Sequence, residues 1–183
     1  MRLFIAINPD TDTKEKILAK QNELHKYFCK GNFSRYELLH LTVIFLGEIE
    51  PNRLSLVKKI ISSTELPKFD VSIKEFGTFK NTNLCWLAIS ADKVLYTLYS
   101  KLQQELIKEG FDIETRKFNP HLTIARELVK YNTVDLSLNE IIRELNKNNK
   151  SDINFTADRI SLMKSERIAG KLTYTEIFSH PLI

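Results

Sequence analysis

The stretch LLHLTVIFLG, residues 38–47, contains a His-Leu-Thr tripeptide followed by a β-branched residue, and the same pattern returns in NPHLTIAR, residues 119–126. The chain has 183 residues and four histidines, so two of the four lie in nearly the same local sequence. The apolar and β-branched residues around both motifs predict strands over residues 39–46 and 121–126. Because residues i and i+2 of a strand share a face, His40 and Thr42 are predicted to point together, as are His121 and Thr123.

Outward from these motifs, hydrophobic periodicity, turn residues and capping residues divide the chain into further elements. In chain order they are a buried strand over 3–7, a helix over 12–28 with a capping box at Asp12 and Glu15, a helix from Pro51, a hairpin over 69–79 and 84–90, a helix from Asp92 to Gly110, a helix capped by Ser137 and Glu140, a break over 146–150, and a hairpin over 153–164 and 171–179 across Gly170. Each half thus has a helix, a motif strand, a helix and a hairpin. This order predicts a single domain over residues 1–183, made of two similar α+β lobes that place the motif strands at equivalent positions beside a shared cleft.

Two imidazoles and two hydroxyls facing one another would suit a small tetrahedral anion, with one histidine as base and the other as acid. A single buried histidine in a strand is more often structural, and threonine favours strands in any case, so the duplication carries this interpretation. Neither motif has acidic or cysteine partners at metal-ligand spacing. The sequence also contains no nucleophile elbow and no glycine-rich phosphate loop.

Bulk composition sets wider bounds. The net charge of +4 suits an anionic partner such as RNA, but 27 basic residues dispersed among 23 acidic ones equally describe a solvated surface. No apolar run is long enough for a membrane span or a secretory signal, so we expect a cytoplasmic protein. Cys29 and Cys85 are expected to be reduced and partly buried. We expect a monomer. Phe4, Phe45 and Tyr36 could each stack on a base, but we expect the two phenylalanines to pack in the core.

Four blocks, MRLFIAI, LHLTVIFLGE, FNPHLTIAR and LMKSERIAGKLTYTEI, occur in an order and with separations that closely resemble the RNA 2′,3′-cyclic phosphodiesterases of the 2H phosphoesterase superfamily, historically called 2′-5′ RNA ligases. The resemblance covers essentially the whole chain. It implies a bilobal α+β fold, with two antiparallel sheets flanking a central cleft and helices outside. It also implies hydrolysis of RNA 2′,3′-cyclic phosphate ends to 2′-phosphates, with no metal or other cofactor.

Residue roles follow from the same resemblance. His40 matches the proton donor to the leaving 3′ oxygen, and His121 matches the acceptor that activates water. Thr42 and Thr123 match the threonines that hold phosphate oxygens, and Arg126 matches a phosphate-binding arginine. Strict alternation places Arg126 on the face opposite His121, where it would be a surface residue, unless the strand ends or bulges near Ala125.

Two rival functions share these motifs. The first is cleavage of 2′-5′ linkages or reversible 2′-5′ ligation of RNA, which would use the same site chemistry. The second is an RNA-binding module that recognises phosphate ends without turnover. Intact histidines and threonines in both halves favour an enzyme over the binding module.

Overall fold

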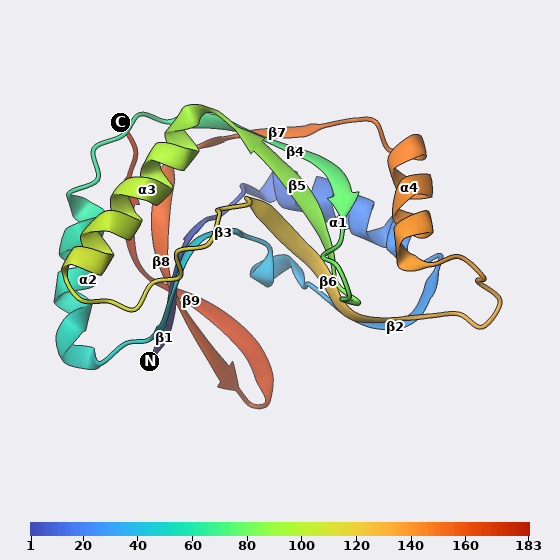
Figure 1. Ribbon diagram of the computed structural model, residues 1–183, viewed down its shortest axis with the longest axis horizontal. Helices are drawn as coiled ribbons and strands as arrows, with labels where there is room; N and C mark the ends of the chain where they lie inside the picture. The colour runs from blue at the N-terminus through green and yellow to red at the C-terminus, as the bar shows by residue number, and fades with distance from the viewer.

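The computed structural model describes residues 1–183 as nine strands, four α-helices and two short 3-10 helices (Figure 1). The strands are β1 (Arg2–Ile7), β2 (Phe28–Phe33), β3 (Leu41–Glu48), β4 (Phe69–Gly77), β5 (Cys85–Ala91), β6 (His121–Lys130), β7 (Ile153–Ala157), β8 (Arg159–Ile168) and β9 (Lys171–Pro181). The helices are α1 (Thr11–Leu24), α2 (Leu54–Ser62), α3 (Lys93–Lys108) and α4 (Leu138–Asn148), with 3-10 turns η1 (Tyr36–Leu38) and η2 (Pro51–Arg53).

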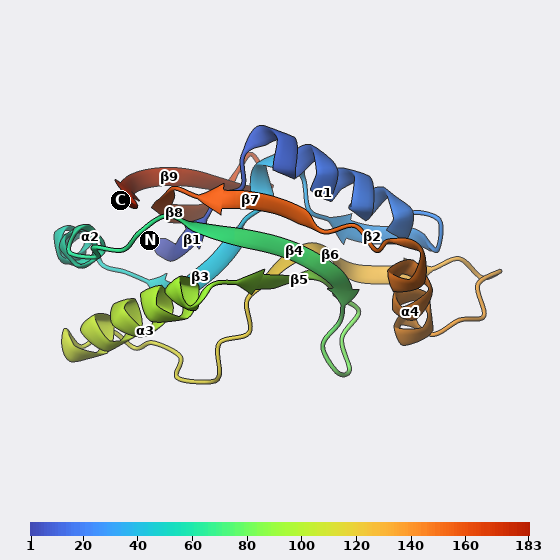
Figure 2. The same cartoon turned by 90° about the horizontal axis from the view of Figure 1, so that it is seen from above.

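The strands form two antiparallel sheets, as the family resemblance implied. One sheet has four strands in the order β3-β1-β8-β9, and the other has five in the order β2-β6-β5-β4-β7. Helices α1 and α4 pack on the five-stranded sheet, while α2 and α3 lie against the four-stranded one (Figure 2). The sheets share one hydrophobic core of 42 buried residues. None of the four α-helices has the combined length and hydrophobicity of a membrane span.

The two motif strands lie in different sheets and meet each other, since β3 contacts β6. Each sheet combines a motif strand from one half of the chain with a hairpin from the other half. The hairpin β4–β5 joins β6, and the hairpin β8–β9 joins the sheet of β3. β3 is an edge strand of its sheet, whereas β6 lies between β5 and the edge strand β2.

Both motif strands contain a bulge directly after the motif threonine. In β3, Ala6 pairs with Thr42 and Ile5 pairs with Ile44, so Val43 is the extra residue. The register of β6 against β5 slips in the same way, from Thr123 to Ala125. An extra residue reverses the strict alternation of faces beyond it. The sixth residue counted from each motif histidine, Phe45 in β3 and Arg126 in β6, is therefore returned to the face of the threonine.

The start of the first helix differs from the sequence prediction. The capping box predicted at Asp12 and Glu15 is wrong, because the N-cap is Asp10, whose carboxylate accepts a hydrogen bond of 2.7 Å from the Thr13 amide. Asp12 lies inside the first turn and pairs with Lys16 instead. The capping box at Ser137 and Glu140, by contrast, is confirmed.

The end of that helix is also different. The predicted range 12–28 is too long, since α1 ends at Leu24 and Phe28 begins the strand β2. Phe28 is buried and falls at helical spacing from Leu24, which explains the error. The rest of β2 is mostly exposed and shows no alternation of polar and apolar residues, so nothing in its pattern indicates a strand.

The strand predicted over 153–164 is two strands in different sheets. β7 and β8 separate at Asp158, whose carbonyl accepts a hydrogen bond from the Leu182 amide. The hairpin across Gly170 is confirmed, with Gly170 at φ +78° in its turn.

Candidate active site

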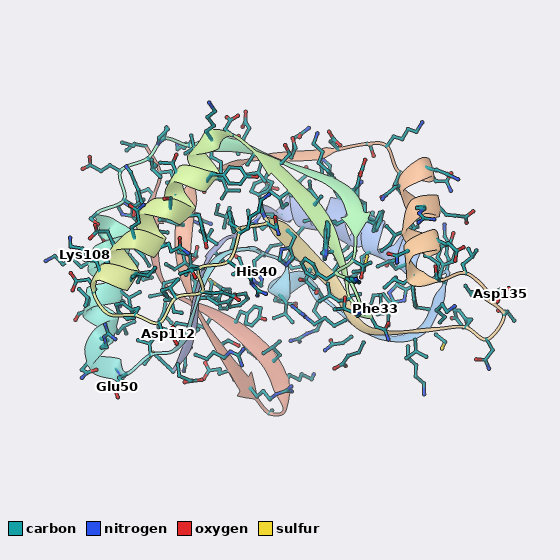
Figure 3. All side chains as sticks on the ribbon, viewed as in Figure 1. Phe33, His40, Glu50, Lys108, Asp112 and Asp135 are labelled. Atoms are coloured by element: carbon teal, nitrogen blue, oxygen red, sulfur yellow. The ribbon has the colours of Figure 1, made fainter.

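His40 stands immediately before β3, near the centre of the molecule (Figure 3). Its Nδ1 lies 2.7 Å from the carbonyl oxygen of Leu38, and its Nε2 lies 2.9 Å from Thr42 Oγ1. A carbonyl can only accept, so Nδ1 carries a proton. The neutral imidazole therefore has its lone pair on Nε2, which accepts a hydrogen bond from the Thr42 hydroxyl.

His121 repeats this arrangement at the first residue of β6. Its Nδ1 lies 2.8 Å from the carbonyl oxygen of Asn119, again two residues before the histidine. The same reasoning places the proton on Nδ1 and leaves Nε2 free. Each motif thus fixes one ring nitrogen with its own backbone and presents the other for proton transfer.

A buried glutamine and a serine tie the approach to the first motif onto the second motif strand. Gln21 is 5% exposed, and its Nε2 donates to the carbonyls of Ser34 and Ile124 at 2.9 and 2.7 Å. Ser34 donates its amide to the Ile124 carbonyl at 2.8 Å and its hydroxyl to the Thr123 carbonyl at 2.9 Å. The carbonyl at the β6 bulge is thereby satisfied. These bonds fix the two motifs relative to each other.

Arg126 reaches the site because of the bulge. Its Nη2 lies 3.5 Å from Thr123 Oγ1, a long hydrogen bond, so the guanidinium lies on the face of the threonine. Ile124 and Ala125 are both fully buried, as expected where two consecutive residues turn away from that face. Strict alternation would have directed Arg126 away from the face of His121 and Thr123, and the structure does not show this.

The charges that act on the histidines are all positive. Burial, followed by the charges of Lys14, Arg126 and His121, lowers the pKa of His40 to about 4, against the opposing hydrogen bond to the Leu38 carbonyl. Burial also lowers the pKa of His121, with further lowering by Arg126 and Arg116. Arg126 thus lowers the pKa of both histidines, and His121 lowers that of His40.

This electrostatic environment favours an anion. No carboxylate is among the groups that influence either histidine. A bound anion would stabilise the protonated imidazoles and raise both pKa values. Lys14 on α1 adds a half-buried ammonium whose pKa is lowered by burial, with its Nζ 5.1 Å from the centroid of the Tyr36 ring.

Aromatic rings surround both histidines. Phe4 and Tyr174 lie 4.8 and 5.2 Å from the His40 ring, centroid to centroid. Phe79 and Trp86 lie 5.1 and 6.1 Å from the His121 ring. Burial of Tyr174 raises the pKa of its hydroxyl, while the positive charges of Arg126 and Arg2 lower it by a smaller amount. These rings are part of the surroundings that bury the two imidazoles.

The site contains residues that sequence reasoning did not identify. Gln21 could have been found, because it falls on the buried face of α1 between Ile17 and Leu24. Ser34 and Tyr174 carry no such signal, since their roles depend on tertiary contacts. The expectation for Phe4 is confirmed, as it is 2% exposed, but that for Phe45 is wrong, as it is 60% exposed.

Both cysteines are free thiols. Cys85 is buried, whereas Cys29 is exposed, so the expectation of partial burial fails for Cys29. No three histidine, cysteine, aspartate or glutamate side chains are grouped as metal ligands anywhere in the chain.

Solved structures share this fold. The apo crystal structure of Escherichia coli LigT superposes with a TM-score of 0.78 at 22% identity, covering 99% of this chain and 96% of the other. A second crystal structure described as a phosphoesterase gives a TM-score of 0.79 at 21% identity, covering 99% and 97%. The fold is therefore that of the LigT-like phosphoesterases, with two antiparallel sheets.

Sequence comparison identifies the family. Residues 13–169 match the model of the 2′-5′ RNA ligase superfamily. A Thermotoga maritima protein named RNA 2′,3′-cyclic phosphodiesterase is 34% identical over 136 residues, which cover 72% of this chain and 71% of the relative. Another of that name, from Methanothermobacter thermautotrophicus, is 27% identical and covers 97% and 96%. This chain belongs to the 2′-5′ RNA ligase superfamily.

Proposed function

We propose that the protein hydrolyses the 2′,3′-cyclic phosphate at the end of an RNA chain to a 2′-phosphomonoester, without a metal ion. The observation that carries this proposal is the repeated geometry of His40 and His121. In each, a backbone carbonyl fixes Nδ1 and the ring lies near positive charge; Nε2 of His40 accepts a hydrogen bond from the Thr42 hydroxyl, and Nε2 of His121 is free. The names of the relatives supply the substrate class.

In the proposed reaction, His121 Nε2 accepts a proton from a water molecule as the water oxygen attacks the phosphorus atom. The bond from phosphorus to the ribose 3′ oxygen breaks on the opposite side, and His40 Nε2 donates a proton to that oxygen. The phosphate remains on the 2′ oxygen. Atoms and charge balance, since one proton enters at His121 and one leaves from His40.

The non-bridging oxygens gain negative charge as the water attacks. The hydroxyls of Thr42 and Thr123 and the guanidinium of Arg126 are the donors on the motif face that would stabilise this charge. Arg126 already contacts Thr123, so one phosphate oxygen bound between them would receive two hydrogen bonds. Removal of the arginine charge is therefore expected to weaken binding of the transition state more than it lowers the stability of the folded protein.

The proton donor needs a proton that the ligand-free protein lacks at neutral pH. With its pKa at about 4, His40 is neutral and holds its proton on Nδ1. The anionic cyclic phosphate would raise this pKa when it binds, so that His40 takes up a proton together with the substrate. Substrate binding and protonation are thus coupled in the proposed cycle.

The test is incubation with an RNA that ends in a 2′,3′-cyclic phosphate, in the presence of EDTA, with identification of the product. We expect a 2′-phosphate from the wild type and losses of roughly 10²- to 10⁴-fold for His40→Ala and His121→Ala. Thr42→Ala and Thr123→Ala should lose less. His25→Ala, in an exposed histidine outside the site, serves as the control.

Three outcomes would count against the proposal. Wild-type turnover in the double variant His40→Ala/His121→Ala would remove both histidines from the mechanism. A 3′-phosphate product would reverse the assignment of the two histidines. Turnover that EDTA abolishes and added metal restores would contradict a metal-independent reaction.

A further inference from the structure

The β8–β9 hairpin extends beyond the rest of its sheet. β1 pairs with β8 only as far as Arg2 and Ser165, whereas the pairing of β8 with β9 continues for three more residues on each strand. This end of the hairpin has no third strand beside it and projects from the molecule (Figure 1). Its base lies at the site, because Tyr174, the partner of Ser165, is 5.2 Å from the His40 ring.

One face of the hairpin continues the surface of the site. Residues that are directly opposite each other on paired strands share a face, so Arg2, Ser165 and Tyr174 form one row across the sheet. Two residues further along each strand, Arg167 and Leu172 form the next row on the same face. The two rows are about 7 Å apart along the strands. A surface that begins beside the site therefore leads outward along the hairpin.

A third arginine joins these two rows from a different segment of the chain. Arg35, just before η1, donates a hydrogen bond from Nη2 to the carbonyl of Leu172. Arg167 donates from Nη1 to the carbonyl of Gly170 in the turn, at 3.0 Å. A guanidinium has five N–H donors, so both side chains keep free donors. Arg2, Arg35 and Arg167, here called the hairpin arginines, thus come together from three separate segments.

The charges on this face are not neutralised. All three hairpin arginines are exposed, and none of them forms an ion pair with a carboxylate. Glu166 is the one carboxylate in the projecting part of the hairpin, and it pairs with Lys164 on the opposite face. The charge of Arg2 also lowers the pKa of the Tyr174 hydroxyl, so positive potential extends from the hairpin to the residue beside His40.

The proposed reaction directs the rest of the RNA towards these arginines. The leaving 3′ oxygen lies on the side of His40, so the terminal ribose lies there too, and the preceding phosphodiester is attached to its 5′ carbon. Arginine suits successive phosphates, because its planar guanidinium makes bidentate, charge-assisted hydrogen bonds to them. We propose that the RNA strand upstream of the terminal nucleotide runs along this face of the hairpin, with its phosphates bound by Arg2, Arg35 and Arg167, an inference that rests on the proposed function.

Recognition of phosphates rather than bases has two consequences. The affinity for an oligonucleotide should not depend on its upstream sequence, because phosphate contacts carry no sequence information. The logarithm of that affinity should fall with the logarithm of the salt concentration, and the three contacts should contribute about −2 to the slope for a single strand. A cyclic mononucleotide ends before the hairpin, so it should bind more weakly and with a smaller dependence on salt.

The kinetic experiment compares a hexaribonucleotide that ends in a 2′,3′-cyclic phosphate with adenosine 2′,3′-cyclic phosphate. Arg2→Gln, Arg35→Gln and Arg167→Gln should each raise KM for the hexanucleotide roughly 2- to 10-fold and leave kcat near the wild-type value, because the contacts exist in both ground and transition states. The constants for the mononucleotide should stay near those of the wild type. Lys171→Gln removes the same charge from the opposite face of the hairpin and is the matched control. Thermal unfolding of each variant verifies that it is folded.

A binding measurement separates this inference from the proposed function. Titration with a hexaribonucleotide that ends in a 2′-phosphate, and with adenosine 2′-monophosphate, requires no turnover. The triple variant of the hairpin arginines should bind the hexanucleotide more weakly, with a salt slope close to that of the mononucleotide, and should bind the mononucleotide as the wild type does. Hexanucleotide binding that depends on these arginines, without hydrolysis by the wild type, would refute the proposed function and leave the path of the RNA standing.

Three results would overturn the path along the hairpin even if hydrolysis occurs. The first is a hexanucleotide affinity that the triple variant leaves unchanged. The second is a loss of the same size for both ligands, or an equal loss in Lys171→Gln, since either would reflect net charge rather than one face. The third is a loss specific to the hexanucleotide in Arg116→Gln instead, because the charge of Arg116 acts on His121 and the strand would then leave on that side.

Discussion

Protonation of His40 should destabilise the folded protein in mildly acidic solution. Its folded-state pKa of about 4 lies below the value of 6.5 for a free imidazole, because burial disfavours the charged ring. Between these two values, the unfolded chain binds more protons than the folded chain. The contribution of neutral, buried His40 to the free energy of unfolding is therefore complete above pH 6.5 and is lost as the pH falls towards 4.

The magnitude follows from the two pKa values. Between pH 7.5 and pH 5, this single group should lower the free energy of unfolding by about 2 kcal/mol. For a chain of this length, such a change corresponds to a melting temperature lower by about 4–8 °C. The pKa of His121 is also lowered and acts in the same direction, so the wild type should show a still larger decrease.

The assay is denaturant unfolding of the wild type and of His40→Gln at a series of pH values. Glutamine does not titrate, so the variant should lose about 2 kcal/mol less between pH 7.5 and pH 5. Carboxylates titrate in both proteins and cancel in the difference, while the offset at pH 7.5 measures the packing effect of the substitution. Equal pH slopes in the two proteins would refute the reasoning, because they would mean that His40 titrates alike in both states.

Further expectations concern catalysis, packing and the link between the motifs. The profile of kcat/KM against pH should have both limbs below 6.5, because this parameter reports the free enzyme, in which both site histidines have lowered pKa values; a falling limb above pH 7 would contradict this. Gly77→Ala would place a Cβ 2.1 Å from Trp86 Cη2, so we expect about 1–3 kcal/mol of destabilisation and altered tryptophan fluorescence. Gln21→Leu leaves the Ile124 carbonyl with one fewer hydrogen-bond donor. The free energy of unfolding should therefore fall by about 1–3 kcal/mol, and turnover should fall as well.

The two antiparallel sheets followed from the family resemblance, whereas the pairing of histidine with threonine in each motif could be predicted from the sequence because alternation within a strand is local. His40 and Thr42 share a face whatever the rest of the chain does, and the duplication supplied the reason to connect them with the second motif. Arg126 shows where local reasoning fails. Its face depends on one extra residue in the register of β6, and register is set by the neighbouring strand rather than by the sequence of β6 itself.

The break at Asp158 did leave a trace in the sequence. The residues of the main core lie at the odd positions 153, 155 and 157 and then at the even positions 160 and 162, so the alternation changes phase at the point where the chain changes sheets. β2 left no such trace, since only Phe28 of its six residues is buried. An exposed edge strand such as β2 is held by backbone hydrogen bonds, which do not require a particular pattern of side chains.

The crossed placement of the two hairpins has a consequence for synthesis of the protein. β1 lies inside its sheet, paired on one side with β3 and on the other with β8, so residues at the start of the chain must wait for a partner from its last quarter. Neither half of the chain contains a complete sheet. A nascent chain released before β9 would expose the edge of β1 or β8 and be prone to aggregation. Two fragments divided in the loop before His121 should be inactive separately and regain activity only on association, each completing the sheet that the other began.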